Sequence, residues 1–565
     1  MKMYKLILFS FLLAGIYACT SDFDKINTNP NAITQNEASA RYFLTVPQYR
    51  LYGPDRFPYW RAQLIHADRY AGQVTFGNHS SWWSDELCYS YNGAYTDAAW
   101  GWLAGYIGSL DTYMKFTQEG GEFENPNMYA VGQIIKSLYF QMYTDVFGEI
   151  PYSEAAKEGV LLPKYDTQKD IYVGIINDLD EAMATIGDKE NTGDGIQNIG
   201  DNDLYYDGDL QKWKKLANTL KLRIATRAMG ANGADFAQAA MQEALQGPLL
   251  TDEADNALLP KDGEISQWGS AAYGDVWYNF GAGSDWKVSE VLIKYLLDNN
   301  DPRLSQYAKP AAGGTITLPR PDQTNSPDDY ALYPKRAQFI IDQIESQGVE
   351  LEVDNSGEEW TVTMPENQYY VGQPVRLGGQ ISSLVRYDFF SSPAEWVIQQ
   401  KNKGLPIFPE IVMTTAESYF LQARASVNGM GSGDAQTLFQ NGIRQAMKLW
   451  KVSDGDIDAY LADAPLAQLN GSTEENLEKI AVQSWIASYT DGFEAWAIVR
   501  KTGYPKELAE GVSDSEIFGL GDINGAYPQR LRYGSGAYSN NGDNVEAAVS
   551  RQGADRQDTK LWFVK

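Results

Sequence analysis

The side chains that most often carry metal or nucleophilic chemistry are scarce in this sequence. Its 565 residues include two histidines, His66 and His79, and two cysteines, Cys19 and Cys88. There is no HExxH motif, no closely spaced pair of cysteines and no serine within GxSxG. Zinc or iron catalysis needs several nitrogen or sulfur ligands at fixed spacing, and a nucleophile needs an adjacent base. The sequence therefore predicts a protein that is not an enzyme.

Acidic side chains leave one catalytic alternative open. The chain has 74 Asp and Glu against 46 Lys and Arg, which gives a net charge of −28. So many carboxyl groups always offer pairs of the kind that glycoside hydrolases use, although no local pattern singles out one pair. A surface glycoside hydrolase with an unrecognised pair is therefore the alternative. The same acidity argues against binding to nucleic acid or to anionic lipid headgroups.

No cofactor is predicted from the two acidic runs that could hold a cation. The run that starts at Asp454 begins like a calcium loop, but Ala459 and Pro465 stand where such a loop requires Gly and Glu. The cluster from Asp201 to Asp209 fits a solvated turn that ends in a helix cap.

Two aromatic segments carry the pattern that indicates a binding site. Residues 76–102 read FGNHSSWWSDELCYSYNGAYTDAAWGW, and residues 267–286 read QWGSAAYGDVWYNFGAGSDW. Aromatic faces stack on sugar rings while amides and carboxylates bind hydroxyl groups, and the same mixture also suits peptides. About half of these aromatics are expected only to pack loops onto helices, and Trp100 and Trp102 resemble the start of a buried helix face. The predicted ligand-binding residues are Trp82, Trp83, Tyr91, Asn78, Asn92, Trp277 and Tyr278.

Helices are the elements that must position these segments. Apolar residues at spacings of three and four predict buried helical stripes over 128–146, 172–183, 213–224, 416–427, 439–450 and 480–489. Thr167, Asp209, and Ser472 with Glu475 carry signals for helix starts. Helices paired across short turns such as NGMGSGD predict a mostly α fold of tetratricopeptide-like hairpins. These hairpins would support long aromatic loops and a few short strands, one of them within 358–364.

The N-terminus has the pattern of an exported lipoprotein. Lys2 and Lys5 precede an apolar run that is too short to span a bilayer, and small residues lead up to Cys19. A cysteine that follows a small residue, with Ile16 three places earlier, is a lipobox arrangement. An ordinary signal peptide with a chance cysteine is the alternative. We predict a signal peptide over residues 1–18, lipid attachment at Cys19, a tether over 19–35 and a single domain over 36–565.

Several stretches, taken in order, resemble the SusD/RagB family of outer-membrane lipoproteins. They are CTSDFDKINTNPN from residue 19, TDVFGEIPYSEA from 144, PKYDTQKDIYVGIINDLDEA from 163, DLYYDGDLQKWKKLANTLKLRIATRA from 203, DPRL from 301, AESYFLQARASVNGM from 416, WIASYTDGFEAWAIVRKTGYP from 485, and the tail from RLRYG to KLWF. The Asn-Pro-Asn turn at 29–31 and the Lys-Leu-Trp end resemble one SusD-like branch in particular.

The resemblance implies four tetratricopeptide-like hairpins and a binding role without catalysis. It implies a lipid-anchored position on the outer face of the outer membrane, and the acidic Ser21-Asp22-Phe23-Asp24 resembles the surface-export signal of such lipoproteins. Its members cover a SusC-like, TonB-dependent barrel and capture oligosaccharides, or in some branches peptides, for import. A purely structural lid subunit is a further alternative. Family members sometimes hold calcium, but no motif here fixes a calcium site.

Overall fold

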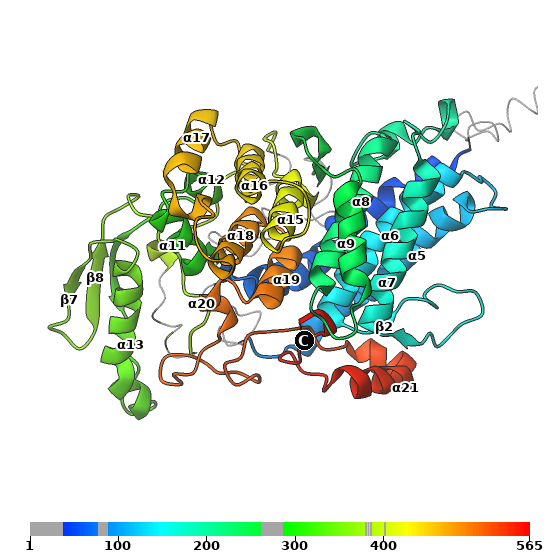
Figure 1. Ribbon diagram of the computed structural model, residues 1–565. Coiled ribbons are helices and arrows are strands. Elements are labelled where there is room, and N and C mark those ends of the chain that lie inside the picture. The colour runs from blue at the N-terminus through cyan, green and yellow to red at the C-terminus, as the bar shows by residue number, and fades with distance from the viewer. Residues whose placement is uncertain are drawn as a thin grey trace, which may run out of the picture.

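The structure, a computed structural model, consists mainly of helices that pack against their neighbours in the chain (Figure 1). It describes residues 38–76, 89–261, 286–378, 381, 384, 387–399 and 403–564. The described part of the chain begins with four short elements. They are η1 (Ala40–Phe43), α3 (Thr45–Tyr52), α4 (Arg56–Pro58) and the π-helix η2 (Tyr59–Asp68). Within these described ranges, no helix is long and apolar enough to cross a membrane.

Helical pairs form the two larger parts of the structure. The first part contains α5 (Gly93–Thr117), α6 (Pro126–Phe147), α7 (Gln168–Ile186), α8 (Leu210–Ala228) and α9 (Phe236–Gln246). The second contains α15 (Thr415–Val427), α16 (Ala435–Leu449), α17 (Asp454–Asp463), α18 (Thr473–Ala487) and α19 (Gly492–Thr502). α6 packs on α7, α8 on α9, α15 on α16 and α18 on α19, and the contact of α8 with α15 joins the two parts. This arrangement confirms the mostly α fold of paired helices.

A third region, drawn in green at the left of Figure 1, combines helices with the short strands. Its helices are α11 (Glu290–Asp298), α12 (Leu304–Tyr307) and α13 (Pro327–Glu345). β6 (Gly314–Leu318), β8 (Trp360–Met364) and β7 (Glu352–Asp354) form an antiparallel sheet in that order. The C-terminal part adds α20 (Lys506–Ala509) and α21 (Ser535–Gln552).

Among the described residues there are also three two-stranded ribbons, two of which join distant parts of the chain. β1 (Val74–Phe76) pairs with β5 (Trp286–Val288), β2 (Ile150–Pro151) with β3 (Tyr165–Asp166), and β4 (Ala257–Leu259) with β9 (Glu410–Met413). All three are antiparallel, and β1–β5 and β4–β9 are the two that join distant parts of the chain.

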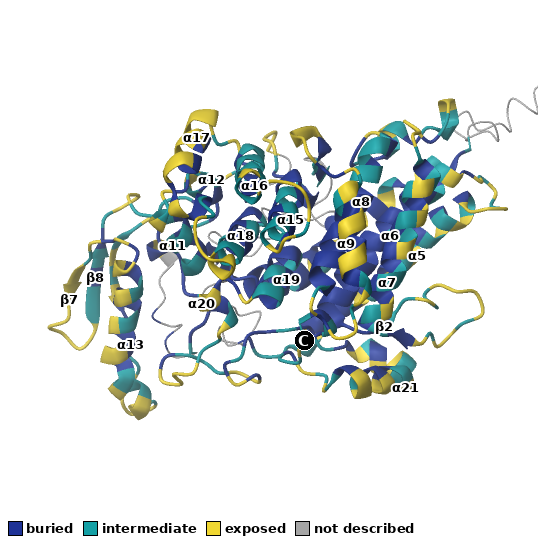
Figure 2. Cartoon of the chain, in the orientation of Figure 1, coloured by how far each residue is buried: buried dark blue, intermediate teal, exposed yellow. Residues whose placement is uncertain are grey.

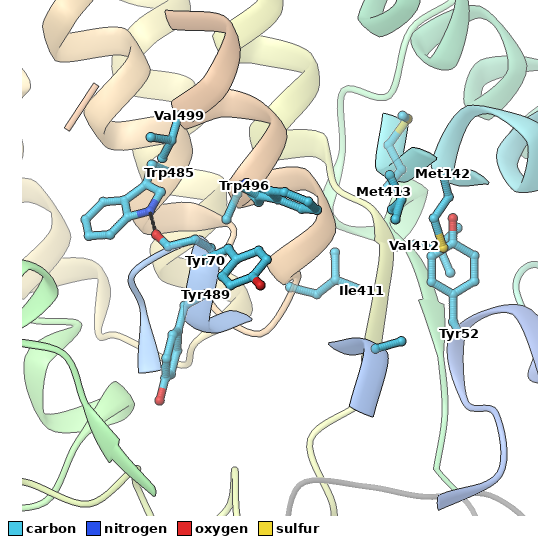
Figure 3. Packing of buried hydrophobic residues seen from close by; sticks show 14 of the residues in the cluster. Tyr52, Tyr70, Met142, Ile411, Val412, Met413, Trp485, Tyr489, Trp496 and Val499 are labelled. Carbon is cyan, nitrogen blue, oxygen red and sulfur yellow. Dashed lines mark hydrogen bonds between the residues drawn. The ribbon is translucent and has the colours of Figure 1, made fainter. Parts of the chain in front are cut away.

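The core runs along the inner helices, which are almost wholly buried in Figure 2. Where α18 and α19 meet the end of η2, Trp485, Trp496 and Tyr70 lie together (Figure 3). Trp485 Nε1 donates a 2.7 Å hydrogen bond to the Ala71 carbonyl oxygen, so this buried indole nitrogen is paired.

The helix start signals act as the sequence predicts. Thr167 Oγ1 accepts from the Asp170 backbone N–H, and the Asp209 carboxylate accepts from two N–H groups in the first turn of α8. Ser472 and Glu475 form a capping box at α18, in which each side chain accepts from the other residue's backbone N–H.

Two sequence-based expectations need correction. The predicted helical stripe over 480–489 is too long, because α18 ends at Ala487 and Tyr489 lies beyond it. Asp203 does not lie in a solvated turn, because it is 1% exposed and accepts hydrogen bonds from the side chains of Gln48 and Trp213 at 2.7 Å. Burial raises the pKa of Asp203, while these hydrogen bonds lower it. Local sequence shows the acidic turn but not the distant groups that cover it.

Candidate functional site

The β1–β5 ribbon joins the two aromatic segments at one place. Phe76, where the first segment begins, is the register partner of Trp286, where the second segment ends. Residues 77–88 and 262–285 lie outside the described part of the chain. The start of the first segment, at Phe76, therefore lies beside the end of the second, at Trp286.

A third segment packs against this ribbon and leads into the same region. The Gln373 N–H donates to the Val288 carbonyl at 2.9 Å, and the Glu290 N–H donates to the Gln373 carbonyl at 2.9 Å. Gly372 allows this close approach, since a Cβ there would lie 2.4 Å from the Glu290 Cα. The ribbon, the start of α11 and residues 371–376 therefore form one connected support.

A cavity of about 190 Å³ lies next to this support. Its walls come from five separate parts of the chain: residue 89, the start of α11, α13, residues 374–376 and residues 507–518. The lining residues are Tyr89, Glu290, Val291, Phe339, Gln343, Pro374, Val375, Arg376, Glu507, Leu508, Gly511, Val512 and Phe518. Aromatic and aliphatic walls with a few polar groups are typical of small-molecule sites.

Tyr89, the residue of the first aromatic segment at which the description of the chain resumes, is held in a fixed position. It is 1% exposed, and its ring lies 4.8 Å from the Arg69 guanidinium and 4.7 Å from that of Arg376. The Tyr70 ring meets it edge-on at 5.1 Å. Arg376 is itself fixed, because its Nη1 donates to the carbonyl oxygens of Gly525 and Ala526. This aromatic wall is therefore preorganised by cation–π and edge-to-face contacts.

The polar groups of the cavity centre on Glu290. With the Gln343 amide oriented by its hydrogen bonds, its nitrogen donates to both Glu290 carboxyl oxygens at 2.6 Å. Burial raises the pKa of Glu290 to about 7; the nearby Glu507 adds to the shift and Lys294 opposes it. Glu507 is exposed and accepts a 3.3 Å hydrogen bond from the Tyr295 hydroxyl. The cavity thus offers carboxyl and amide groups beside aromatic walls, a set suited to a polyhydroxylated ligand.

The predicted site residues are described only in part. Trp82, Trp83, Asn78, Trp277 and Tyr278 lie outside the described residues, as does Cys19. Their roles stay predictions.

Tyr91 and Asn92 are described and lie just beyond the cavity wall. The Arg532 guanidinium lies 3.9 Å from the Tyr91 ring, and the Tyr91 N–H donates to Asp522. Asn92 caps α5 by accepting from the Tyr95 N–H at 3.1 Å. Neither residue lines the cavity. Of the residues that do, only Tyr89 lies within an aromatic segment, and the others carry no local motif that could have revealed them.

Among the residues that the structure describes, no group of three or more His, Cys, Asp or Glu side chains could hold a metal ion. No curated protein matches the sequence.

Comparison with protein-family models and solved structures identifies the class of protein. The SusD-like model described as "Starch-binding associating with outer membrane" matches residues 35–318 and 363–533. A solved "chitin-binding protein" is similar at 25% identity with a TM-score of 0.70, over 93% of this chain and 99% of that one. A SusD-like protein from Bacteroides thetaiotaomicron is 24% identical with a TM-score of 0.68, over 93% and 98% of the two chains. A chitin-binding SusD homologue from Flavobacterium johnsoniae is 19% identical with a TM-score of 0.70, over 93% and 98%.

The family match covers well over half of the sequence, and the solved structures share the fold along nearly its whole length. The chain therefore belongs to the SusD-like family of outer-membrane-associated, glycan-binding proteins. Members of this family are generally binding proteins without catalytic activity.

Proposed function

We propose that this protein is a cell-surface lipoprotein of the outer membrane that binds oligosaccharides and delivers them, unaltered, to a SusC-like TonB-dependent barrel. Lipid on Cys19 would hold it at the membrane. The observation that carries the proposal is the 190 Å³ cavity, whose aromatic walls and carboxyl and amide groups lie where β1 and β5 bring the two aromatic segments together.

Chitin-type oligosaccharides are the ligand class that we favour. The family description names starch, whereas the 25%-identical solved structure is a chitin-binding protein. Sugar rings of this type present apolar faces for stacking, and their hydroxyl and N-acetyl groups need hydrogen-bond partners such as Gln343 and Glu290. Trp82 and Trp83, next to the cavity in the chain, are proposed to supply the main stacking faces.

Calorimetric titration of the purified protein with chito-oligosaccharides, malto-oligosaccharides and peptides tests the proposal. We expect binding of the chitin series, and loss of that binding in the double variant Trp82→Ala/Trp83→Ala with unchanged helical circular dichroism. Phe339→Ala, in the cavity wall, should weaken binding by at least tenfold. Phe236→Ala is the matched control, because this half-buried ring on α9 stacks on Trp562 away from the cavity.

The same samples distinguish the proposal from its alternatives. Release of new reducing ends from any of these glycans would contradict a binding-only role. Failure to bind any glycan, together with co-purification of a TonB-dependent barrel from outer membranes, would instead support a purely structural lid subunit.

A further inference from the structure

A buried charged cluster lies where α8 meets α15 and α19, beside a second cavity that shares no lining residue with the one described above. Arg223 pairs with Glu417 at 2.5 Å, and Arg227 pairs with both Asp145 and Glu494. These three carboxylates exceed the two arginines by one negative charge. Asp491 lies nearby, but burial raises its pKa to about 8, which favours the neutral acid at pH 7.

Two further cations in this cluster have no carboxylate partner among the described residues. Within that part of the chain, Arg424 on α15 makes no side-chain hydrogen bond or ion pair, and the one acidic group that acts on it is the exposed Glu474. Lys501 on α19 donates to the carbonyl oxygens of Met229 and Phe563, at 2.8 and 2.9 Å. Burial lowers the pKa of Lys501 to about 8, and the positive charges of Arg424 and Arg227 add to this effect. With Arg424 and Lys501, the cluster holds four cations against the three carboxylates named above, a net charge of +1.

Arg424 and Lys501 line one cavity of about 50 Å³ between α8, α15, α18 and α19. Thr226 also lines it; this residue is 7% exposed, and its Oγ1 has no hydrogen-bond partner among the residues that the structure describes. A buried hydroxyl is stabilised by a hydrogen-bond partner, so Thr226 can donate to an acceptor placed beside these two cations. The lining also includes the Arg223–Glu417 and Arg227–Glu494 ion pairs, whose carboxylates are already neutralised by these arginines. Its apolar side includes Phe420 and Ile480.

We propose that this cavity binds a small organic carboxylate of about the size of acetate. Its two oxygens would accept from Arg424, Lys501 and Thr226, and its carbon end would lie against Phe420 and Ile480. The volume agrees, because one water needs about 10–15 Å³ of such space, so the cavity holds roughly four heavy atoms. The ligand would neutralise the excess positive charge and strengthen the junction between the two helical parts. The oligosaccharide cavity is not involved.

Thermal unfolding of the full-length protein in detergent, at pH 7 and constant ionic strength, tests this proposal. Sodium acetate should raise the Tm in a concentration-dependent way, because a ligand that binds only the native state stabilises it. Acetamide, which has the same shape without the charge, and sodium chloride should not. Sodium sulfate, which lacks an apolar end, should have a smaller effect than acetate. Line broadening of the acetate methyl NMR signal provides a direct measure of binding.

Variants in the cavity make the test specific. Arg424→Gln should weaken acetate binding by at least tenfold, and Thr226→Val, which preserves the side-chain shape, should weaken it by several fold. Arg444→Gln removes a surface arginine of α16 that pairs with Asp458, and should leave the acetate effect unchanged. The proposal is overturned if acetate stabilises no more than acetamide or sulfate. It is equally overturned if the acetate effect persists in both cavity variants.

Discussion

Replacement of Glu290 by glutamine should change how the stability of the protein depends on pH. Burial raises the pKa of Glu290 from 4.5 to about 7, so the native state binds this proton more tightly than the unfolded state does. The stabilisation is therefore fully present below pH 4.5 and is lost as the pH rises through 7. The amide of the Glu290→Gln variant is neutral throughout, which removes this dependence.

The magnitude follows from proton linkage. With these two pKa values, the stabilisation falls by up to about 2.5 kcal/mol between pH 5 and pH 8. The hydrogen bonds from Gln343 favour the ionised carboxylate, so this figure is the upper end of the expected range. Unfolding entropies of about 2.1 cal/mol/K per residue give roughly 1.2 kcal/mol/K for a chain of this length, so the expected shift is up to about 2 °C.

The assay compares the Tm of the wild type and of Glu290→Gln at several pH values, so that all other titrating groups cancel. Relative to the wild type, the Tm of the variant should rise by up to about 2 °C between pH 5 and pH 8. Glu510→Gln is the control, because it removes the charge of an exposed carboxylate three residues from Glu507. The Tm of this control should differ from that of the wild type by the same amount at every pH. If the Tm difference between Glu290→Gln and the wild type is also constant from pH 5 to pH 8, the raised pKa assigned to Glu290 is wrong.

Three further substitutions test other parts of the molecule. Cys19→Ala should abolish labelling of the protein with radioactive palmitate and release it from the membrane fraction; a labelled variant would contradict lipid attachment at this residue. Asp203→Ala leaves the buried donors of Gln48 and Trp213 without an acceptor, and should lower the stability by about 3 kcal/mol and the Tm by about 2–3 °C. Ser472→Ala removes the capping box of α18, and should lower the stability by only about 1 kcal/mol in denaturant unfolding. An equal loss in Asp203→Ala and Ser472→Ala would show that the burial of Asp203 contributes little.

The helical frame was predictable because its signals are local. The stripe of Tyr172, Ile175 and Leu179 at spacings of three and four marks the buried face of α7. The side chains of Thr167, Asp209 and Ser472 cap the helices that they precede. Tyr489 shows the limit of this reasoning. Its spacing from Trp485 continues the helical pattern, but α18 ends first, and Tyr489 packs on Tyr307 at 4.5 Å instead. The apolar pattern alone does not show where a helix stops.

The candidate site could be located from the sequence only as a region. The aromatic segments stood out by composition, but the cavity is assembled from residues that are far apart in the chain, such as Tyr89, Glu290, Phe339 and Phe518. The pairing of Phe76 with Trp286 that brings the two segments together spans 210 residues and has no local signature. Long-range contacts of this kind follow from the packing of the whole chain. The predicted solvated turn at Asp203 is wrong for the same reason, because Gln48, which donates to its carboxylate, is 155 residues away.

The polar groups of the cavity and the aromatic segments come from different parts of the chain, and this affects how ligand specificity can change. The polar groups of the cavity are held by helices and by the β1–β5 ribbon: Glu290 by the start of α11, Gln343 by α13, and Arg376 by two backbone carbonyls. The first aromatic segment begins at this support and the second ends there, so substitutions in residues 77–88 and 262–285 leave the residues of the support unchanged. Solved structures at 19–25% identity share the fold over 93% of this chain. A support that tolerates such divergence can present different aromatic segments, and we therefore expect ligand preference to follow residues 77–88 and 262–285 more closely than the helical frame.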